Sequence, residues 1–274
     1  MDKKTKIHDF STPIVMGIIN LTTNSFYDGG RFSNNKDILQ HIDKMIREGA
    51  SIIDIGAESS KPGSKRISIQ EELKKIKPIL KEIKIKHSEI LVSIDTYKSE
   101  VAKECVSLGA DIINDISAGE LDKNMFKTIA ELQVPYVMNH MQGDPENMQT
   151  SPQYESVTND IIKIFESKIN ILKKLNFNNI IIDPGFGFGK NLNHNYTLLN
   201  DLDKFKQLNL PILVGISRKS MISNALGVTT ENSLNGTTVA NTIAIMKGAN
   251  ILRVHDVKEA MECLKINKFL SQNN

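Results

Sequence analysis

Short apolar runs alternate with segments of helical periodicity along most of this sequence, and this alternation limits the possible folds more than any other feature. The runs are almost continuously hydrophobic, as parallel strands buried on both faces are. Alternating strands and helices are typical of βαβ units, and eight units favour a closed barrel over an open doubly wound sheet. The eight runs occupy residues 14–19, 51–55, 90–94, 111–113, 134–138, 180–182, 212–214 and 251–252.

The segments between the runs carry apolar residues at three- and four-residue spacing, which predicts amphipathic crossover helices. Residues 71–86, 155–175 and 233–247 show this pattern most clearly. A (β/α)8 barrel takes about 250 residues, so one barrel would use nearly all of the 274 residues. Since no linker divides the chain, we predict a single-domain α/β protein, a (β/α)8 TIM barrel with its core at about residues 13–270.

Composition argues against several classes of protein. The net charge of +2 is too small to indicate a nucleic-acid groove. Cys105 and Cys263 are the only cysteines, which argues against a disulfide framework or a cysteine zinc site and fits a reducing compartment. Pro13, Gly17 and Asn20 interrupt the apolar stretch near the N-terminus, so it resembles neither a secretory signal nor a membrane span. We expect a cytoplasmic protein that binds neither nucleic acid nor membrane.

A polar residue ends most of the apolar runs. Any one of these residues alone would be explained as a cap for the following helix. Several of them meeting at the carboxyl rim of one barrel, where barrel enzymes keep their active sites, predict a ligand cavity. Carboxylates and amides suit a flat, nitrogen-rich heterocycle, because they pair with ring N–H donors and ring nitrogens. The residues are Asn20, Asp95, Asn114, Asp183 and Arg253.

Basic residues follow the last two predicted strands. Arg218 and Lys219 follow the seventh, and Arg253 and His255 end the eighth. Loops at these places commonly bind phosphate, and a helix beginning near Lys219 would add backbone N–H groups. For Lys219 and Arg253 we favour anion binding, whereas Arg218 could simply pair with a surface acid.

The segment 183–190 is glycine-rich but lacks the spacing of a P-loop. Its glycines would allow the backbone to approach a ligand closely, and Phe186 and Phe188 could be either core residues or a ligand wall. The six histidines show no metal-binding spacing, and His140 and His255 are the site candidates because they lie at strand ends.

Taken together, these segments make the sequence closely similar to the dihydropteroate synthase family. The matching motifs follow the family's order from about Pro13 to Glu259. They are residues 16–30 (MGIINLTTNSFYDGG), 54–63 (DIGAESSKPG), 93–96 (SIDT), 113–116 (INDI), 140–143 (HMQG), 183–190 (DPGFGFGK), 215–220 (GISRKS) and 253–256 (RVHD).

The resemblance implies a transferase of folate biosynthesis. It would condense 6-hydroxymethyl-7,8-dihydropterin diphosphate with p-aminobenzoate, giving 7,8-dihydropteroate and diphosphate with the assistance of Mg²⁺. In this mapping Asp95, Asn114 and Asp183 hold the pterin ring edge, and Lys219 binds its carbonyl and a ring nitrogen. A homodimer formed through barrel helices far from the site is implied as well.

The same resemblance places the second substrate and the leaving group. Arg253 would stack on the pterin and bind the diphosphate with Asn20 and His255, and Asn20 would also position Mg²⁺. Asp28 joins Asp95, Lys219 and Arg253 as a residue of the reacting centre. The p-aminobenzoate pocket would comprise Phe26, Asp28, Ser60, Pro62 and Phe188, with Ser220 receiving the carboxylate.

Several positions depart from the family's pattern. Thr23-Asn24 stands where Pro-Asp is common, and Ser60-Lys61 where Thr-Arg is usual. Asn139 replaces a methionine that packs on the pterin, which makes the pocket locally more polar. None of these changes removes a principal ligand.

Three alternatives fit parts of the pattern. A pterin-binding methyltransferase would share the strand-end Asp and Asn residues, but it would need a cobalamin-domain partner and has no use for the anion-binding residues. A paralogue that binds pterin without catalysis would fit the loop departures. A Schiff-base aldolase would use Lys219 as its nucleophile.

Overall fold

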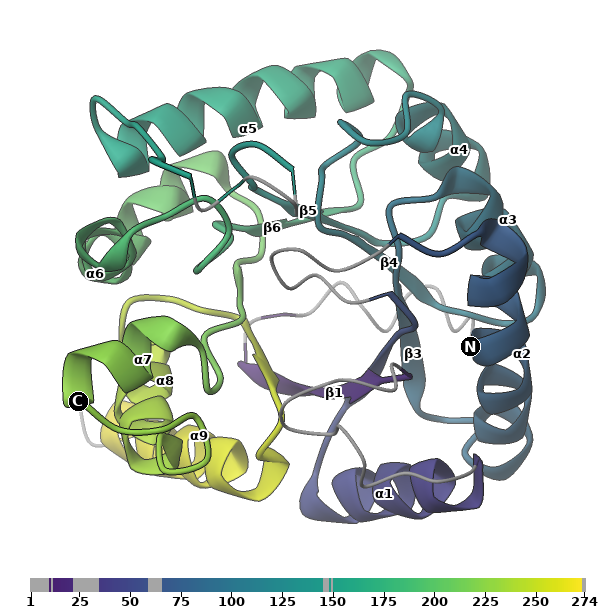
Figure 1. Cartoon of the computed structure of the whole chain (residues 1–274), viewed down its shortest axis with the longest axis horizontal. Coiled ribbons are helices and arrows are strands. Elements are labelled where there is room, and N and C mark those ends of the chain that lie inside the picture. Colours follow the sequence, from purple (N-terminus) through teal and green to yellow (C-terminus); the bar gives the residue numbers. More distant parts are fainter. Residues whose placement is uncertain are drawn as a thin grey trace.

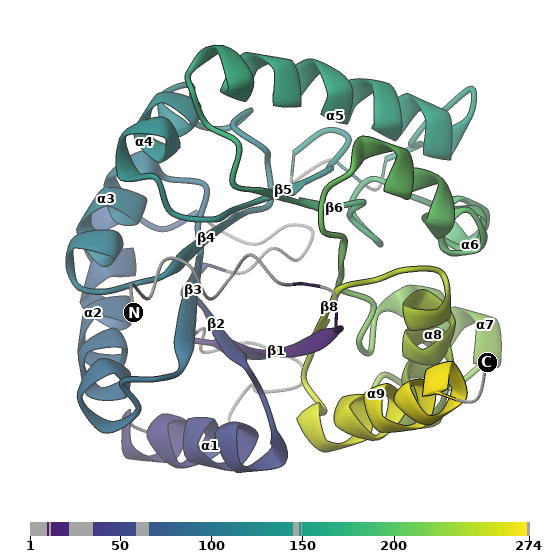
Figure 2. The same ribbon diagram turned by 180° about the vertical axis from the view of Figure 1, so that it is seen from behind.

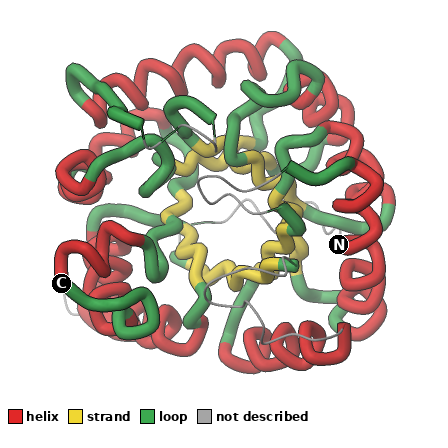
Figure 3. Tube along the Cα trace, in the orientation of Figure 1, coloured by secondary structure: helices red, strands yellow, loops and turns green. Residues whose placement is uncertain are grey.

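Eight parallel strands form a barrel in the computed structural model, which describes residues 10, 12–21, 35–58, 66–144, 148 and 150–272. The strand order is β6-β5-β4-β3-β2-β1-β8-β7, and a parallel bridge between Ile182 and Ile212 joins β6 to the β7 segment. The predicted (β/α)8 barrel is therefore confirmed (Figures 1 and 3). The strands are β1 Ile14–Asn20, β2 Ile52–Gly56, β3 Leu91–Asp95, β4 Ile112–Asp115, β5 Tyr136–Asn139, β6 Ile180–Asp183, β7 Leu213–Val214 and β8 Ile251–Val254.

Helices surround the barrel as an outer ring, which Figure 2 shows from behind. The predicted segments 71–86, 155–175 and 233–247 correspond to α2, α5 and α8. None of the described helices is both long and apolar enough to cross a membrane. The helices are α1 Asn35–Glu48, α2 Ile69–Lys86, α3 Ser99–Ser107, α4 Met125–Leu132, α5 Val157–Lys174, α6 Leu192–Asn200, the 3-10 helix η2 Leu202–Leu208, α7 Ser220–Leu226, α8 Leu234–Met246 and α9 Val257–Gln272.

Helix α2 begins two residues earlier than its apolar periodicity predicts, because a capping box fixes its start. The backbone N–H of Glu71 donates to Ser68 Oγ at 3.2 Å, and the N–H of Ser68 donates to Glu71 Oε2 at 2.9 Å. These two bonds satisfy backbone donors that a helix start otherwise leaves without partners.

The inside of the barrel is divided into an apolar floor and a polar layer. Side chains of a strand alternate between its two faces, so inward-facing residues recur every two positions. Seven buried side chains form the floor, namely Met16, Ile52, Ile112, Val137, Ile181, Leu213 and Ile251.

The polar layer lies two residues further along each strand, toward the carboxyl ends. Its positions, from β1 to β8, are occupied by Ile18, Asp54, Ser93, Asn114, Asn139, Asp183, Gly215 and Arg253. The strand period therefore places acids, amides and a guanidinium around the barrel axis, above the apolar floor.

Candidate active site at the barrel mouth

An ion-pair network centred on Arg253 occupies the polar layer. Arg253 Nε donates to Asp54 Oδ2 at 2.7 Å, and its Nη2 donates to Asp95 Oδ2 at 2.6 Å. Asn114 Nδ2 also donates to Asp54 Oδ2, at 3.1 Å. The structure thus brings together three of the predicted strand-end residues, Asp95, Asn114 and Arg253, and connects them through Asp54.

Asp54 is a site residue that sequence reasoning missed. It is fully buried, and its Oδ1 has no hydrogen-bond partner among the described residues. The available signal was a carboxylate in the middle of the apolar run Ile52-Ile53-Asp54-Ile55. Because a buried charge requires a partner, this position could have been used to predict an ion pair inside the barrel.

The two other acids of the mouth have unusual proton affinities. Burial raises the pKa of Asp95 to about 7, against the opposing effect of the Arg253 cation, and the nearby Asp54 adds to the rise. Burial also raises the pKa of Asp183, whereas Lys219 acts in the opposite direction. Asp183 Oδ1 accepts the backbone N–H of Gly185 at 2.8 Å.

Lys219 reaches this site from the loop after β7. Its ammonium donates to the carbonyl oxygen of Phe186 and lies 4.4 Å from the centre of the Phe188 ring. Burial lowers the pKa of Lys219 to about 8, although Asp183 favours the charged form. Phe186 is fully buried and belongs to the core, whereas Phe188 contacts the site cation.

The glycine-rich loop after β6 is held from below by Lys190, another residue that sequence reasoning missed. Lys190 Nζ lies 2.8 Å from the Gly185 carbonyl oxygen, 3.0 Å from that of Phe188 and 3.0 Å from His140 Nδ1. Burial lowers the pKa of both Lys190 and His140 well below its usual value. His140, a predicted site candidate, therefore supports this loop.

Gly185 cannot be replaced without displacing the neighbouring strand end. Its φ is +73°, and a Cβ atom there would lie 1.8 Å from the His140 carbonyl oxygen. The hydroxyl of Tyr154 donates to the Gly189 carbonyl oxygen at 2.8 Å, which joins the loops after β5 and β6 at a second point.

The basic residues after β7 and β8 have different roles. Arg218 binds both carboxylate oxygens of Asp256, through Nε at 2.7 Å and Nη2 at 3.0 Å. The alternative of an acid partner for Arg218 is thus confirmed, although Asp256 is largely buried. Burial, with the nearby Arg253 cation, lowers the pKa of His255 to about 3, so its imidazole is neutral at physiological pH.

Asn139, one of the departures from the family pattern, lies in the polar layer and is buried. Its Nδ2 donates to the Ile116 carbonyl oxygen at 2.8 Å. Since a carbonyl only accepts, this bond fixes the amide orientation. Its Oδ1 is left without a partner among the described residues, as is the Oγ of the buried Ser93.

The remaining predicted site residues fall into two groups. Asn20 ends β1, opposite Gly56 of β2, and Ser220 is the first residue of α7. The other four, which are Phe26, Asp28, Ser60 and Pro62, lie outside the described residues.

No group of three or more His, Cys, Asp or Glu side chains in the described part of the chain is arranged to hold a metal. Asn20 offers one amide oxygen at the rim. Mg²⁺ commonly keeps several waters and binds largely through substrate phosphates. Among the described residues, the donor set therefore fits a Mg²⁺ that enters with a phosphorylated substrate better than a metal held by protein ligands alone.

Comparisons with known proteins agree with this geometry. The family described as "Pterin binding enzyme" matches residues 16–255. Dihydropteroate synthase of Escherichia coli strain K12 is 43% identical over 260 residues, which cover 94% of this chain and 92% of that protein. The Haemophilus influenzae dihydropteroate synthase is 40% identical, with 95% of both chains covered.

Solved structures give the same result. The Yersinia pestis dihydropteroate synthase in complex with a sulfonamide drug superposes with a TM-score of 0.93 at 41% identity, covering 96% of each chain. The Xanthomonas albilineans dihydropteroate synthase with 4-aminobenzoic acid has a TM-score of 0.88 at 33% identity, covering 96% of this chain and 94% of that one.

Asp54→Asn is expected to lower the pKa of Asp95 below its present value of about 7. The substitution removes a like charge beside Asp95 and leaves the Arg253 cation to act mainly on Asp95. A ¹³C NMR titration of the Asp95 carboxyl would measure the change, with the half-exposed Asp203→Asn as the control. An unchanged or higher pKa would contradict the central role given to Asp54.

Proposed function

This chain belongs to the dihydropteroate synthase family of pterin-binding enzymes, and we propose that its barrel mouth condenses 6-hydroxymethyl-7,8-dihydropterin diphosphate with p-aminobenzoate. The products are 7,8-dihydropteroate and diphosphate, which makes the protein a transferase of folate biosynthesis. The observation that carries the proposal is the Asp54–Arg253–Asp95 network with Asn114, and with Asp183 and Lys219 close enough to act on it electrostatically.

The pterin half of the site uses acceptors and donors of the polar layer together with Asp95 and Lys219. The Asp183 and Asp95 carboxylates and the Asn114 amide hold the ring edge, and the Lys219 ammonium donates to the ring carbonyl and a ring nitrogen. A carboxylate matches paired N–H donors, so these groups select an aminopyrimidinone edge. Arg253 stacks on the ring, and the two acids that fix its guanidinium plane support this role.

The reaction depends mainly on electrostatic stabilisation of the charges that develop as the diphosphate leaves. The bond between the exocyclic methylene and the diphosphate oxygen breaks, and the diphosphate leaves with the electron pair. Nη1 of Arg253, which bonds to none of the described residues, and the neutral His255 donate to the leaving oxygens.

The remaining residues act on the cation and on the incoming amine. Asp95 and Asp183 stabilise the resonance-delocalised cation that remains on the pterin. The arylamine nitrogen then attacks the methylene carbon and loses its proton to water, and no strong general base is required because an aromatic amine is nucleophilic at neutral pH.

The arylamine site uses Phe188 and the loop residues predicted from the sequence. Phe26, Asp28, Ser60 and Pro62 complete this pocket, and Ser220 receives the carboxylate. Asp28 also acts at the reacting centre. A Xanthomonas albilineans relative with 4-aminobenzoic acid supports this half of the assignment.

Mg²⁺ is part of the proposal, with Asn20 as its protein ligand at the rim. Bound there with the diphosphate, the metal would neutralise charge that develops on the leaving group. Asn20 orients the same oxygens by hydrogen bonding. We also propose a reducing, cytoplasmic setting, which the two free and buried thiols of Cys105 and Cys263 support.

Formation of dihydropteroate by the purified protein tests this function directly. We expect turnover with both substrates and Mg²⁺, and a loss of about 10²-fold or more in Asp95→Asn and Lys219→Ala. Product is measured by chromatography and folding by circular dichroism. A protein that binds the pterin but forms no dihydropteroate would be a binding paralogue, and normal activity in either variant would refute the assigned role.

The pH dependence follows from two site groups. Asp95 must be ionised and Lys219 protonated, and their pKa values are about 7 and about 8. We therefore expect kcat/KM for the pterin diphosphate to be bell-shaped, with its acid limb near 7 and its alkaline limb near 8. In Lys219→Arg the alkaline limb should disappear, because arginine stays protonated, and the acid limb should remain. A profile that keeps both limbs in this variant would contradict the assignment to Lys219.

We further propose a homodimer formed through α8 and α9. Helix α8 contains no charged residue, and it buries polar Thr237 and Asn241 while it exposes apolar side chains. Helix α9 packs beside it and also exposes apolar side chains. The exposed side chains are Val239, Ile243, Met246, Ile266, Phe269 and Leu270. Surfaces of this kind mark protein interfaces.

Val239→Glu is expected to halve the mass of the protein in solution, because it places a charge in the proposed interface. Light scattering after size exclusion measures the mass. Ile85→Glu is the matched control, since Ile85 is 79% exposed and lies on α2, across the barrel from α8 (Figures 1 and 2). A wild-type monomer, or a dimer that both variants retain, would refute this interface.

A further inference from the structure

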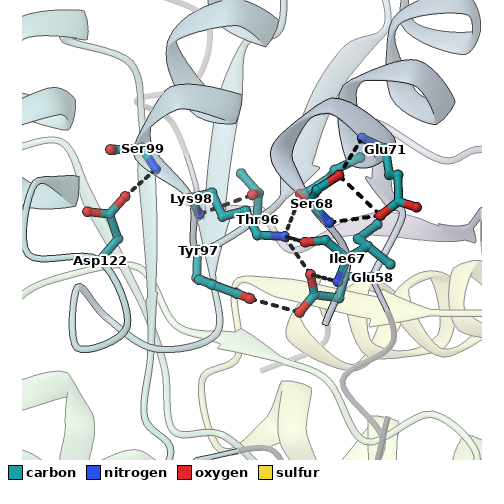
Figure 4. Close-up of polar contacts among 10 residues, drawn as sticks. Glu58, Ile67, Ser68, Glu71, Thr96, Tyr97, Lys98, Ser99 and Asp122 are labelled. Atoms are coloured by element: carbon teal, nitrogen blue, oxygen red, sulfur yellow. Dashed lines mark hydrogen bonds and ion pairs between the residues drawn. The ribbon is translucent and has the colours of Figure 1, made fainter. Parts of the chain in front are cut away.

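A second ion-pair cluster lies beside the catalytic network and has no role in the mechanism described above. It joins Glu58, which follows β2, to Tyr97 and Lys98, which follow β3 (Figure 4). Glu72, in the first turn of α2, completes it.

Lys98 is the centre of this cluster. Its Nζ donates to Glu58 Oε2 at 2.5 Å, to Glu72 Oε2 at 2.6 Å and to the Ile67 carbonyl oxygen at 2.9 Å. These three bonds use all the donors of an ammonium group. The side chain is only 12% exposed and that of Glu72 1%. Burial opposes the charge, but the bonds to Glu58 and Glu72 outweigh it and raise the pKa of Lys98.

Three groups donate hydrogen bonds to the Glu58 carboxylate. Besides Lys98, its carboxylate accepts the Tyr97 hydroxyl at 2.9 Å and the backbone N–H of Ile67 at 3.3 Å. Lys98 and Glu58 therefore both bind Ile67, one through its carbonyl and one through its N–H. The β2–α2 connection is thereby fixed at Glu58 and at Ile67, the two points where it leaves the barrel and returns to α2.

The turn that carries Lys98 is itself rigid and directly follows Asp95. The N–H of Thr96 donates to the Asn114 carbonyl oxygen at 2.9 Å, and that of Lys98 donates to Thr96 Oγ1 at 3.2 Å. The next N–H, of Ser99, donates to Asp122 at 2.8 Å. The position of Lys98 is therefore coupled to the strand ends that hold Asp95 and Asn114.

Stability alone does not explain such a cluster. Burying two carboxylates around one ammonium has a desolvation cost that a well-packed apolar set would avoid. The exposed pair Lys77–Glu104, which connects the neighbouring α2 and α3, bears no such cost. The buried cluster instead provides geometry, since it ties Glu58 and Ile67 to the turn that follows Asp95.

We propose that Lys98, acting with Glu58, is a positioning residue for the arylamine half of the reaction, an inference that rests on the proposed function. It fixes Glu58 and Ile67, the described residues on either side of the predicted arylamine-pocket residues Ser60 and Pro62, against the turn after β3. The three bonds of the Lys98 ammonium go to Glu58, Glu72 and Ile67, and none of them goes to the pterin ligands Asp95 and Asn114. We therefore expect loss of Lys98 to affect p-aminobenzoate more than the pterin.

Steady-state kinetics of Lys98 variants test this inference. Lys98→Met is expected to raise the KM for p-aminobenzoate by about tenfold to a hundredfold, because misplacement by about 1 Å has effects of that size. The KM for the pterin diphosphate should change little, and Lys98→Arg should restore much of the arylamine affinity. Lys77→Met is the control, and it removes an ion pair from the same helix pair without touching Glu58.

A double variant separates positioning from stability. Lys98→Met leaves Glu72 buried without its cation, so the melting temperature should fall, and adding Glu72→Gln should recover most of that loss. The arylamine KM should stay high in the double variant. Recovery of the arylamine KM together with stability, or equal changes in both KM values, would overturn the proposal. Absence of turnover in the unsubstituted enzyme would overturn the proposed function, and this inference with it.

Discussion

The buried contact between Asp54 and Arg253 is the interaction on which the rest of the site depends. The two side chains come from β2 and β8, the strands on either side of β1. Each is nearly or fully removed from water, so loss of Arg253 would leave the Asp54 carboxylate buried without a cation, at a cost of about 3–5 kcal/mol. Nη2 of the same guanidinium donates to Asp95.

This arrangement is possible because the barrel separates its structural and chemical parts along one axis. The floor from Met16 to Ile251 consists of buried apolar side chains. Polar groups above it therefore interact in a medium of low polarizability, where charges act strongly on one another. The raised pKa of Asp95 and the lowered pKa of Lys219 are consequences of that position.

Much of this could be predicted from the sequence, because strand ends have a local signature. Asp95, Asn114, Asp183 and Arg253 each end or nearly end an apolar run, and the ends of parallel strands meet at one rim. Closure of the barrel could not be predicted from the sequence in the same way, because it depends on a single bridge beside the two-residue strand β7.

The residues that were missed share one property, which is that their partners are distant in the chain. Asp54 pairs with a residue 199 positions away, and Lys190 with one 50 positions away. In the sequence, Lys98 is an ordinary residue before a predicted helix. Only the fold places Glu58 and Glu72 beside it. No local sequence pattern reveals such pairings. The carboxylate of Asp54 within an apolar run does, however, indicate that a partner must exist.

The contact between Gly185 and the end of β5 has a consequence for how this enzyme can be altered. A side chain at Gly185 would collide with the His140 carbonyl, and Lys190 and Tyr154 join the same two loops at other points. The loops after β5 and β6 thus behave as one interlocked part rather than two. If only one of the two loops were replaced by that of a relative, its contacts with the other loop would no longer fit. Grafts and recombination breakpoints should therefore keep residues 140–190 as a single block.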